Sequence, residues 1–332
     1  MKRKFGLLKF LSLALVGAFT FGVACAPINS SNSDSSSIDS SSIVDDSSSS
    51  DSSSSSDSPV EYTPHWNDDG ILKILLIGNS FSEDAIENLY DMAKAAGIEQ
   101  MELGHLYIGG CSLATHLQNI SFNLPQYRYS SKIGDDVWRT SLYNKPSVGF
   151  AANDWDFVTI QQSSDQSGKA NTYDDVNPLL DKIQSQCTNE NVAFAWHMTW
   201  AYQQDTDHWA FPDYSSNQMT MYNSIVSSVQ QKIVTNHSIV KIIPSGTAIQ
   251  NARTSYLGDT LTRDGYHLSL TQGRLIASAS YLASLIDVDW DSVDLSSISD
   301  DEDFVKVLKE SVKNAVQTPF SVTASTITEK AN

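Results

Sequence analysis

The segment ILKILLIGNSFSEDAIENLYDMAKAAG, residues 71–97, decides the fold class of this 332-residue chain. Its first seven residues, 71–77, are apolar except for Lys73, and this pattern is typical of a strand buried on both faces. A Gly-Asn-Ser turn follows at 78–80, and the amphipathic stretch Glu83–Ala96 predicts a helix that stops at Gly97. A buried strand that leads through a tight turn into a helix is the repeating unit of α/β proteins.

The same alternation continues along the chain. Further strands are expected at residues 101–108, 156–161, 192–200 and 240–243, and further helices near 113–119, 176–186, 216–234 and after 269. Residues 126–132 and 136–142, which flank Gly134-Asp135, predict a hairpin inserted outside the core. We therefore expect a flavodoxin-like, doubly wound parallel sheet of about five strands, with its site at the carboxyl ends of the strands.

The first 26 residues have the features of an export signal, because a basic start is followed by an apolar run interrupted by small residues. The string Val23-Ala24-Cys25 resembles a bacterial lipobox and favours lipidation of Cys25. Cleavage after Ala26 by ordinary signal peptidase is an alternative, and an uncleaved membrane anchor is less favoured because Gly17 and Gly22 weaken a short span. We expect an exported protein, held at the cell surface when lipidated and otherwise secreted.

Residues 27–66 contain a tract of Ser and Asp that cannot bury enough apolar surface to fold, so they predict a disordered linker. Residues 67–332 then form one domain. The whole chain has a formal charge of −18, and residues 59–332 carry −16 of it. This acidity argues against nucleic-acid binding and against docking on an anionic membrane, so a lipid anchor is the expected membrane contact.

Three polar elements follow the expected strands. Ser80 lies at or just before a helix start, where backbone N–H groups can stabilise a developing anion, although Ser80-Phe81-Ser82-Glu83 also fits a capping box. Gly109-Gly110 follows the second strand and could present backbone N–H groups, but glycine pairs are also common in turns. Asp264 and His267 lie three residues apart before a helix, which is the arrangement that a serine nucleophile requires.

These residues resemble a known group of enzymes. The strings Gly78-Asn79-Ser80-Phe81-Ser82, Tyr107-Ile108-Gly109-Gly110-Cys111-Ser112 and Asp264-Gly265-Tyr266-His267-Leu268-Ser269 are similar to blocks of the SGNH/GDSL-like hydrolases, and to an exported, poorly characterised bacterial subgroup among them. The resemblance spans residues 71–285. It implies a three-layer α/β/α sandwich and ester hydrolysis through an acyl-enzyme, with Ser80 as nucleophile, His267 as general base and Asp264 as the group that orients the imidazole.

The resemblance also implies an oxyanion hole made by the backbone N–H of Ser80, the backbone N–H of Gly110 and a side-chain amide after the third strand. This chain departs from the usual Gly-x-Asn-Asp there and has Gln161-Gln162-Ser163-Ser164-Asp165. A Gln amide offers the same donor at a longer reach, so we expect Gln162 in this role and Gln161 on the opposite side of the strand. The alternative is that both amides only terminate the strand.

Aromatic residues after the fourth strand suggest a sugar-containing substrate. His197, Trp200 and Tyr202 are the expected substrate contacts, with Trp209, Phe211 and Tyr214 in the following loop. A packed aromatic cluster is the alternative for Trp196 and Trp200. Arg263 and Arg274 could bind a substrate carboxylate, but structural ion pairs are the favoured interpretation.

Three classes of function are compatible with these residues. The leading hypothesis is a serine esterase that removes an acyl group, acetyl above all, from a carbohydrate; the acidic domain favours a neutral glycan. The alternatives are a catalytically silent glycan-binding surface lipoprotein and a flavodoxin-like phosphate or nucleotide binder, although no glycine-rich loop with a Lys is present. No cofactor is expected, and no metal, because the histidines lack ligand spacing.

Overall fold

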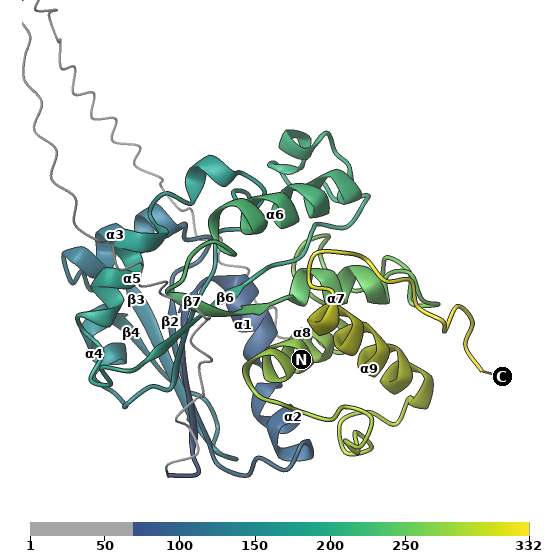
Figure 1. The fold of residues 1–332 in the computed structure, drawn as a ribbon, viewed down its shortest axis with the longest axis horizontal. Coiled ribbons are helices and arrows are strands. Elements are labelled where there is room, and N and C mark those ends of the chain that lie inside the picture. The colour runs from purple at the N-terminus through teal and green to yellow at the C-terminus, as the bar shows by residue number, and fades with distance from the viewer. Residues whose placement is uncertain (1–68, 332) are drawn as a thin grey trace, which may run out of the picture. The chain divides into compact units, whose positions relative to one another are not determined.

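Seven strands form one mixed sheet in the computed structural model, which describes residues 69–331 (Figure 1). Their order across the sheet is β4-β3-β2-β1-β5-β6-β7. The strands are β1 (Leu72–Gly78), β2 (Met101–Tyr107), β3 (Tyr127–Ile133), β4 (Arg139–Asn144), β5 (Phe157–Ile160), β6 (Ala193–His197) and β7 (Ile239–Ile243). The expected signal peptide (1–26), the lipidation site Cys25 and the linker (27–66) lie outside the described residues.

Five of the strands run parallel in the order β2-β1-β5-β6-β7, which is the order of a flavodoxin-like doubly wound sheet. The predicted fold class is confirmed, but the predicted number of strands is too low. The hairpin expected outside the core is β3-β4, which pairs antiparallel with β2. Without this hairpin β2 would expose a row of unpaired backbone groups at the sheet edge.

Helices cover both faces of the sheet (Figure 1). They are α1 (Ser80–Ile86), α2 (Leu89–Ala95), α3 (Leu113–Ser121), α4 (Pro146–Phe150), α5 (Val176–Gln184), α6 (Gln218–Lys232), α7 (Ser245–Ala252), α8 (Gln272–Leu285) and α9 (Glu302–Gln317), with 3-10 turns η2 (Ala170–Thr172) and η3 (Phe211–Tyr214). One face is covered by α3, α4 and α5, and the other by α1, α2, α7, α8 and α9. The predicted three layers are thus confirmed. Within residues 69–331 no helix is long and apolar enough to cross a membrane.

The helix expected at residues 83–96 is two shorter helices, α1 and α2, separated by Glu87 and Asn88. Its predicted end is correct: Gly97 has a φ of 85°, and its N–H donates to the carbonyl of Lys94. Glycine adopts this left-handed conformation without the strain that a side chain would cause.

The three neighbouring strands β2, β1 and β5 end at the same end of the sheet, so the loops that follow them lie together there. In β1, Ile77 pairs with Ile160 of β5, and Gly78 pairs with Tyr107 of β2. Because these strands are parallel and in step, the loops that follow them emerge side by side. A site built from the loops after β1, β2 and β5 can therefore form at this end of the sheet.

Candidate active site

The turn between β1 and α1 presents Ser80 as the first residue of the helix. Asn79 is the N-cap, and its Oδ1 accepts a hydrogen bond of 3.0 Å from the backbone N–H of Phe81. The capping role considered for Ser80 is therefore filled by its neighbour, and the Ser80 hydroxyl is available for other contacts. Gly78 permits this tight turn, because a Cβ there would lie 2.5 Å from Ser82 Oγ.

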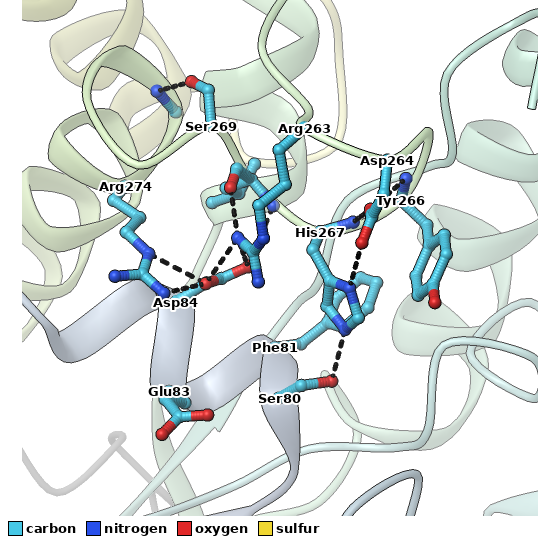
Figure 2. Close-up of polar contacts among 12 residues, drawn as sticks. Ser80, Phe81, Glu83, Asp84, Arg263, Asp264, Tyr266, His267, Ser269 and Arg274 are labelled. Atoms are coloured by element: carbon cyan, nitrogen blue, oxygen red, sulfur yellow. Dashed lines mark hydrogen bonds and ion pairs between the residues drawn. The ribbon is translucent and has the colours of Figure 1, made fainter. Parts of the chain in front are cut away.

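Three side chains from distant parts of the sequence form a continuous hydrogen-bonded chain (Figure 2). The Ser80 hydroxyl oxygen lies 2.8 Å from His267 Nε2, although the two residues are 187 positions apart. On the other side of the ring, His267 Nδ1 lies 2.7 Å from Asp264 Oδ2. The structure thus brings together the three residues predicted as nucleophile, base and orienting carboxylate.

The second oxygen of Asp264 fixes the loop itself, because Oδ1 accepts a hydrogen bond of 2.8 Å from the backbone N–H of His267. Burial raises the pKa of Asp264, but the hydrogen bonds from His267 outweigh burial and hold the pKa below its ordinary value. An ionised carboxylate keeps the imidazole proton on Nδ1. The His267 Nε2 lone pair can then accept the proton of the Ser80 hydroxyl.

Beside these residues, the carboxylate of Asp84 links α1 to the loop that carries His267 (Figure 2). Asp84 is only 1% exposed and accepts hydrogen bonds from Arg263 at 2.9 and 3.0 Å and from Arg274 at 2.8 Å. It also accepts one of 2.9 Å from the backbone N–H of Leu268. A buried carboxylate needs such compensation. The predicted structural ion pairs of the two arginines are confirmed.

The structure corrects the expected substrate contacts. His197, Trp200 and Tyr202 are fully buried, so none of them reaches the surface. Trp200 stacks on Phe81 with ring centroids 4.4 Å apart, and its Nε1 donates to the carbonyl of Tyr266 at 2.8 Å. The packed-cluster alternative therefore holds for Trp200, which supports α1 and the imidazole loop together.

Gln162 also differs from its expected role. Its Nε2 donates to the carbonyl and hydroxyl oxygens of Thr172 at 2.9 and 3.0 Å. Its Oε1 accepts from the backbone N–H groups of Leu113 and Ser163. Since both amide protons are used and the side chain is buried, Gln162 is not an oxyanion donor in this structure. It holds the loop after β5 against the start of α3.

Sequence reasoning missed the structural part played by Asn79. Its Oδ1 also accepts from Gln161 Nε2 at 2.8 Å, and Gln161 Oε1 accepts from His197 Nδ1 at 2.8 Å. Burial lowers the pKa of His197 to about 3, so its ring is neutral. This chain joins the ends of β1, β5 and β6 around the turn that presents Ser80. The sequence predicts Gln161 on the side of the strand opposite to Gln162, and this orientation was the available indication that Gln161 contacts other residues than Gln162 does.

Two backbone N–H groups remain for an oxyanion. Neither the N–H of Ser80 nor that of Gly110 has a hydrogen-bond acceptor within the described part of the chain. Gly110 is exposed in the turn after β2 and has a φ of 61°. Fixed peptide N–H groups without acceptors are suited to stabilise the negative charge that develops on an ester oxygen.

Two other histidines, His105 and His116, lie in the core and do not belong to the hydrogen-bonded chain of Ser80. His105 and His116 are buried, and burial lowers the pKa of each to about 3. His105 Nε2 lies 2.9 Å from Ser82 Oγ, which makes a second serine–histidine pair that solvent does not reach. Between residues 69 and 331, no group of three or more His, Cys, Asp or Glu side chains is placed to hold a metal ion.

Comparisons with known proteins identify close and distant similarities. The model of the DUF4886 family, described as a domain of unknown function, matches residues 73–306. A crystal structure of a DUF4886 family protein from Bacteroides uniformis ATCC 8492 is 38% identical, with a TM-score of 0.73, and the match covers 77% of this chain and 98% of that one. The chain matches none of the curated proteins with which it was compared.

Two other solved structures have lower sequence identity to this chain. A candidate SGNH hydrolase from Slackia heliotrinireducens is 16% identical, with a TM-score of 0.42 over 65% of this chain and 100% of that one. A candidate acylhydrolase from Bacteroides fragilis NCTC 9343 is 12% identical, with a TM-score of 0.37 over 75% of this chain and 88% of that one. These similarities are too low to support a statement about activity.

Proposed function

The chain belongs to the DUF4886 family, and from the geometry of its site we propose that it is a serine esterase that acts through an acyl-enzyme. The observation that carries this proposal is the unbroken hydrogen-bonded chain from Ser80 through His267 to Asp264, with distances of 2.8 and 2.7 Å. A serine in this arrangement is activated as a nucleophile. The motif resemblance to SGNH/GDSL-like hydrolases supports the same reaction.

In the acylation step, Ser80 Oγ attacks the ester carbonyl carbon while its proton moves to His267 Nε2. The carbonyl oxygen becomes an oxyanion, which the backbone N–H groups of Ser80 and Gly110 stabilise. Asp264 stabilises the imidazolium that forms. The tetrahedral intermediate then breaks its bond to the alcohol oxygen, and the alcohol leaves with the proton from Nε2.

In the deacylation step, a water molecule takes the place of the alcohol. His267 Nε2 accepts its proton as the water oxygen attacks the acyl carbon. The second tetrahedral intermediate releases the carboxylic acid, and the proton on Nε2 returns to Ser80 Oγ. The two steps together consume one water molecule and leave the three side chains in their starting state.

For the substrate we propose an acyl ester, acetyl above all, on a carbohydrate. The formal charge of −16 on residues 59–332 supports a neutral glycan, because such a field repels polyanions. The proposed place of action is outside the cell. The export signal at residues 1–26 supports this, and the lipobox-like string supports attachment through Cys25.

Hydrolysis of p-nitrophenyl acetate by the Ser80→Ala variant tests the proposed reaction. We expect the rate to fall by at least about 10³-fold, since removal of a nucleophile abolishes the covalent route. Ser82→Ala is the matched control, because Ser82 belongs to the other serine–histidine pair two residues away but is buried. A Ser80→Ala protein that keeps the normal rate would show that the proposal is wrong.

A further inference from the structure

Three aromatic rings extend outward from the imidazole of His267. Tyr266 lies 4.2 Å from His267 between ring centroids, and His208 lies 4.7 Å from Tyr266. Trp209 stacks on His208 at 5.6 Å with an angle of 29° between the ring planes. We call Tyr266, His208 and Trp209 the aromatic ledge. It begins beside the base of the proposed triad and leads away from it.

The outer end of the ledge is open to solvent. Trp209 is 73% exposed, so most of its indole surface contributes nothing to the core. Phe211 and Tyr214, the other aromatic residues expected in this loop, are buried. A flat apolar ring held in the open beside a polar site is suited to pack against one face of a ligand.

Contacts with Tyr202 and with the backbone of Ala210 hold the aromatic ledge in place. Tyr202 lies 4.4 Å from His208 between ring centroids, and its hydroxyl donates to Ser164 Oγ at 2.9 Å. His208 Nδ1 accepts a hydrogen bond of 3.2 Å from the backbone N–H of Ala210. These contacts fix the histidine ring on which Trp209 stacks, so a ligand would meet a preformed surface.

The loop of the ledge is also joined to the loop of the triad. The backbone N–H of Gln203 donates to the carbonyl of Gly265 at 2.7 Å. Gly265 has a φ of 87°, and a Cβ there would clash with Thr206. A ligand on the ledge is therefore held at a defined position relative to His267.

The charges around the ledge select against anions. Asp165, Asp207 and Asp264 are close enough to act electrostatically on His208. Burial nevertheless lowers the pKa of His208, so its ring carries no charge at neutral pH. Carboxylates beside neutral rings repel anionic ligands but accept hydrogen bonds from hydroxyl groups. The ligand that fits this surface has an apolar face and many hydroxyl groups.

We infer that the aromatic ledge binds a neutral sugar unit of the substrate other than the sugar that carries the ester. This inference rests on the proposed esterase function and narrows its substrate to an acylated neutral oligosaccharide or polysaccharide. Trp209 makes the outermost contact and determines specificity without touching the reacting atoms. Binding energy at such a remote contact favours long substrates over small ones.

The kinetic experiment compares Trp209→Ala, Trp209→Phe and Phe122→Ala on p-nitrophenyl acetate and on acetylated xylo-oligosaccharides. Phe122 is the matched control because it is 71% exposed and lies at the end of α3. We expect Trp209→Ala to raise KM for the oligosaccharide about tenfold, with kcat/KM on the aryl ester unchanged, as a lost remote contact would do. Trp209→Phe should restore most of the affinity, and Phe122→Ala should have no effect.

Equal effects of Trp209→Ala on the two substrates, or no effect on either, would overturn the assignment of the ledge. A binding measurement distinguishes failure of the ledge assignment from failure of the proposed esterase function. Ser80→Ala protein should bind unmodified xylo-oligosaccharides by isothermal titration calorimetry, and the Ser80→Ala, Trp209→Ala protein should bind them about tenfold more weakly. If both proteins bind equally, or neither binds, the ledge proposal is wrong even when Ser80-dependent hydrolysis of the aryl ester is intact.

Discussion

The buried carboxylate of Asp84 accepts a hydrogen bond of 2.9 Å from the backbone N–H of Leu268. Asp84 lies one turn after Ser80 on α1, and Leu268 directly follows His267. The contact therefore links the helix of the proposed nucleophile to the loop of the proposed base. It joins two parts of the chain that are 184 residues apart.

We expect Asp84→Asn to reduce stability and kcat together. The variant leaves two arginines without their shared anion, so the free energy of unfolding should fall by about 2 kcal/mol or more. It also loosens the loop that positions His267, which should lower kcat more than it changes KM. Urea denaturation and steady-state kinetics measure the two effects. Arg139→Ala removes an exposed ion pair and should change neither; an unchanged kcat in Asp84→Asn would contradict the positioning role.

We expect Asp264→Asn to lower kcat by about 10³–10⁴-fold, because an amide favours the wrong imidazole tautomer. The fold should persist, since Asp264 is 40% exposed on its side chain. Steady-state rates and a thermal melt measure the two quantities. Asp154→Asn is the control, because Asp154 is exposed and precedes β5, at the other end of the sheet. A loss of less than tenfold in Asp264→Asn would show that this carboxylate does not orient His267.

Gln162→Leu distinguishes the observed role of this side chain from the expected one. The substitution breaks the hydrogen bonds to Thr172 and leaves buried backbone groups unpaired, which should cost about 1–3 kcal/mol of stability. We expect kcat to change less than about tenfold. Removal of an oxyanion donor would instead reduce kcat by about 10²–10³-fold with little loss of stability, and that result would restore the role expected from the sequence.

The buried histidines should make the fold sensitive to acid. Burial lowers the pKa of His105, His116 and His197 to about 3, whereas histidines in the unfolded chain take up protons near pH 6.5. Between these values the unfolded state binds more protons, so the free energy of unfolding falls as the pH falls from about 6.5 towards 3.

One histidine should account for about 2 kcal/mol of this loss between pH 7 and pH 5. We expect His116→Gln to reduce the pH dependence by that amount, as measured by urea denaturation at the two pH values. His237→Gln is the control, because His237 is exposed. If the two variants have the same pH dependence as the parent protein, burial of His116 does not set its protonation.

Much of the fold could be predicted because the parallel strands are short apolar runs bounded by turns. The segment at residues 71–77 and its partners show this pattern clearly. The hairpin β3-β4 could be recognised as a hairpin but not placed, since its pairing with β2 depends on which sheet edge is free. The break between α1 and α2 was also missed, because it falls inside a continuous amphipathic pattern.

The site could be predicted only in part for a related reason. Ser80, Asp264 and His267 stand at turns, where the direction of a side chain follows from the local backbone. The directions of Gln162 and Trp200 depend on packing between distant elements, namely Thr172 for the amide and Phe81 for the indole. Residue spacing carries no information about such contacts, so buried supports and exposed contacts could not be told apart.

The most direct test of the proposed reaction is the site of modification by a fluorophosphonate. Mass spectrometry of the tryptic peptide 74–94, which contains both Ser80 and Ser82, would locate the adduct. We predict a single adduct on Ser80, formed much more slowly in the His267→Ala variant and absent from Ser80→Ala. An adduct on Ser82, or no adduct on this peptide in a protein that hydrolyses p-nitrophenyl acetate, would contradict the assignment of Ser80 as the nucleophile.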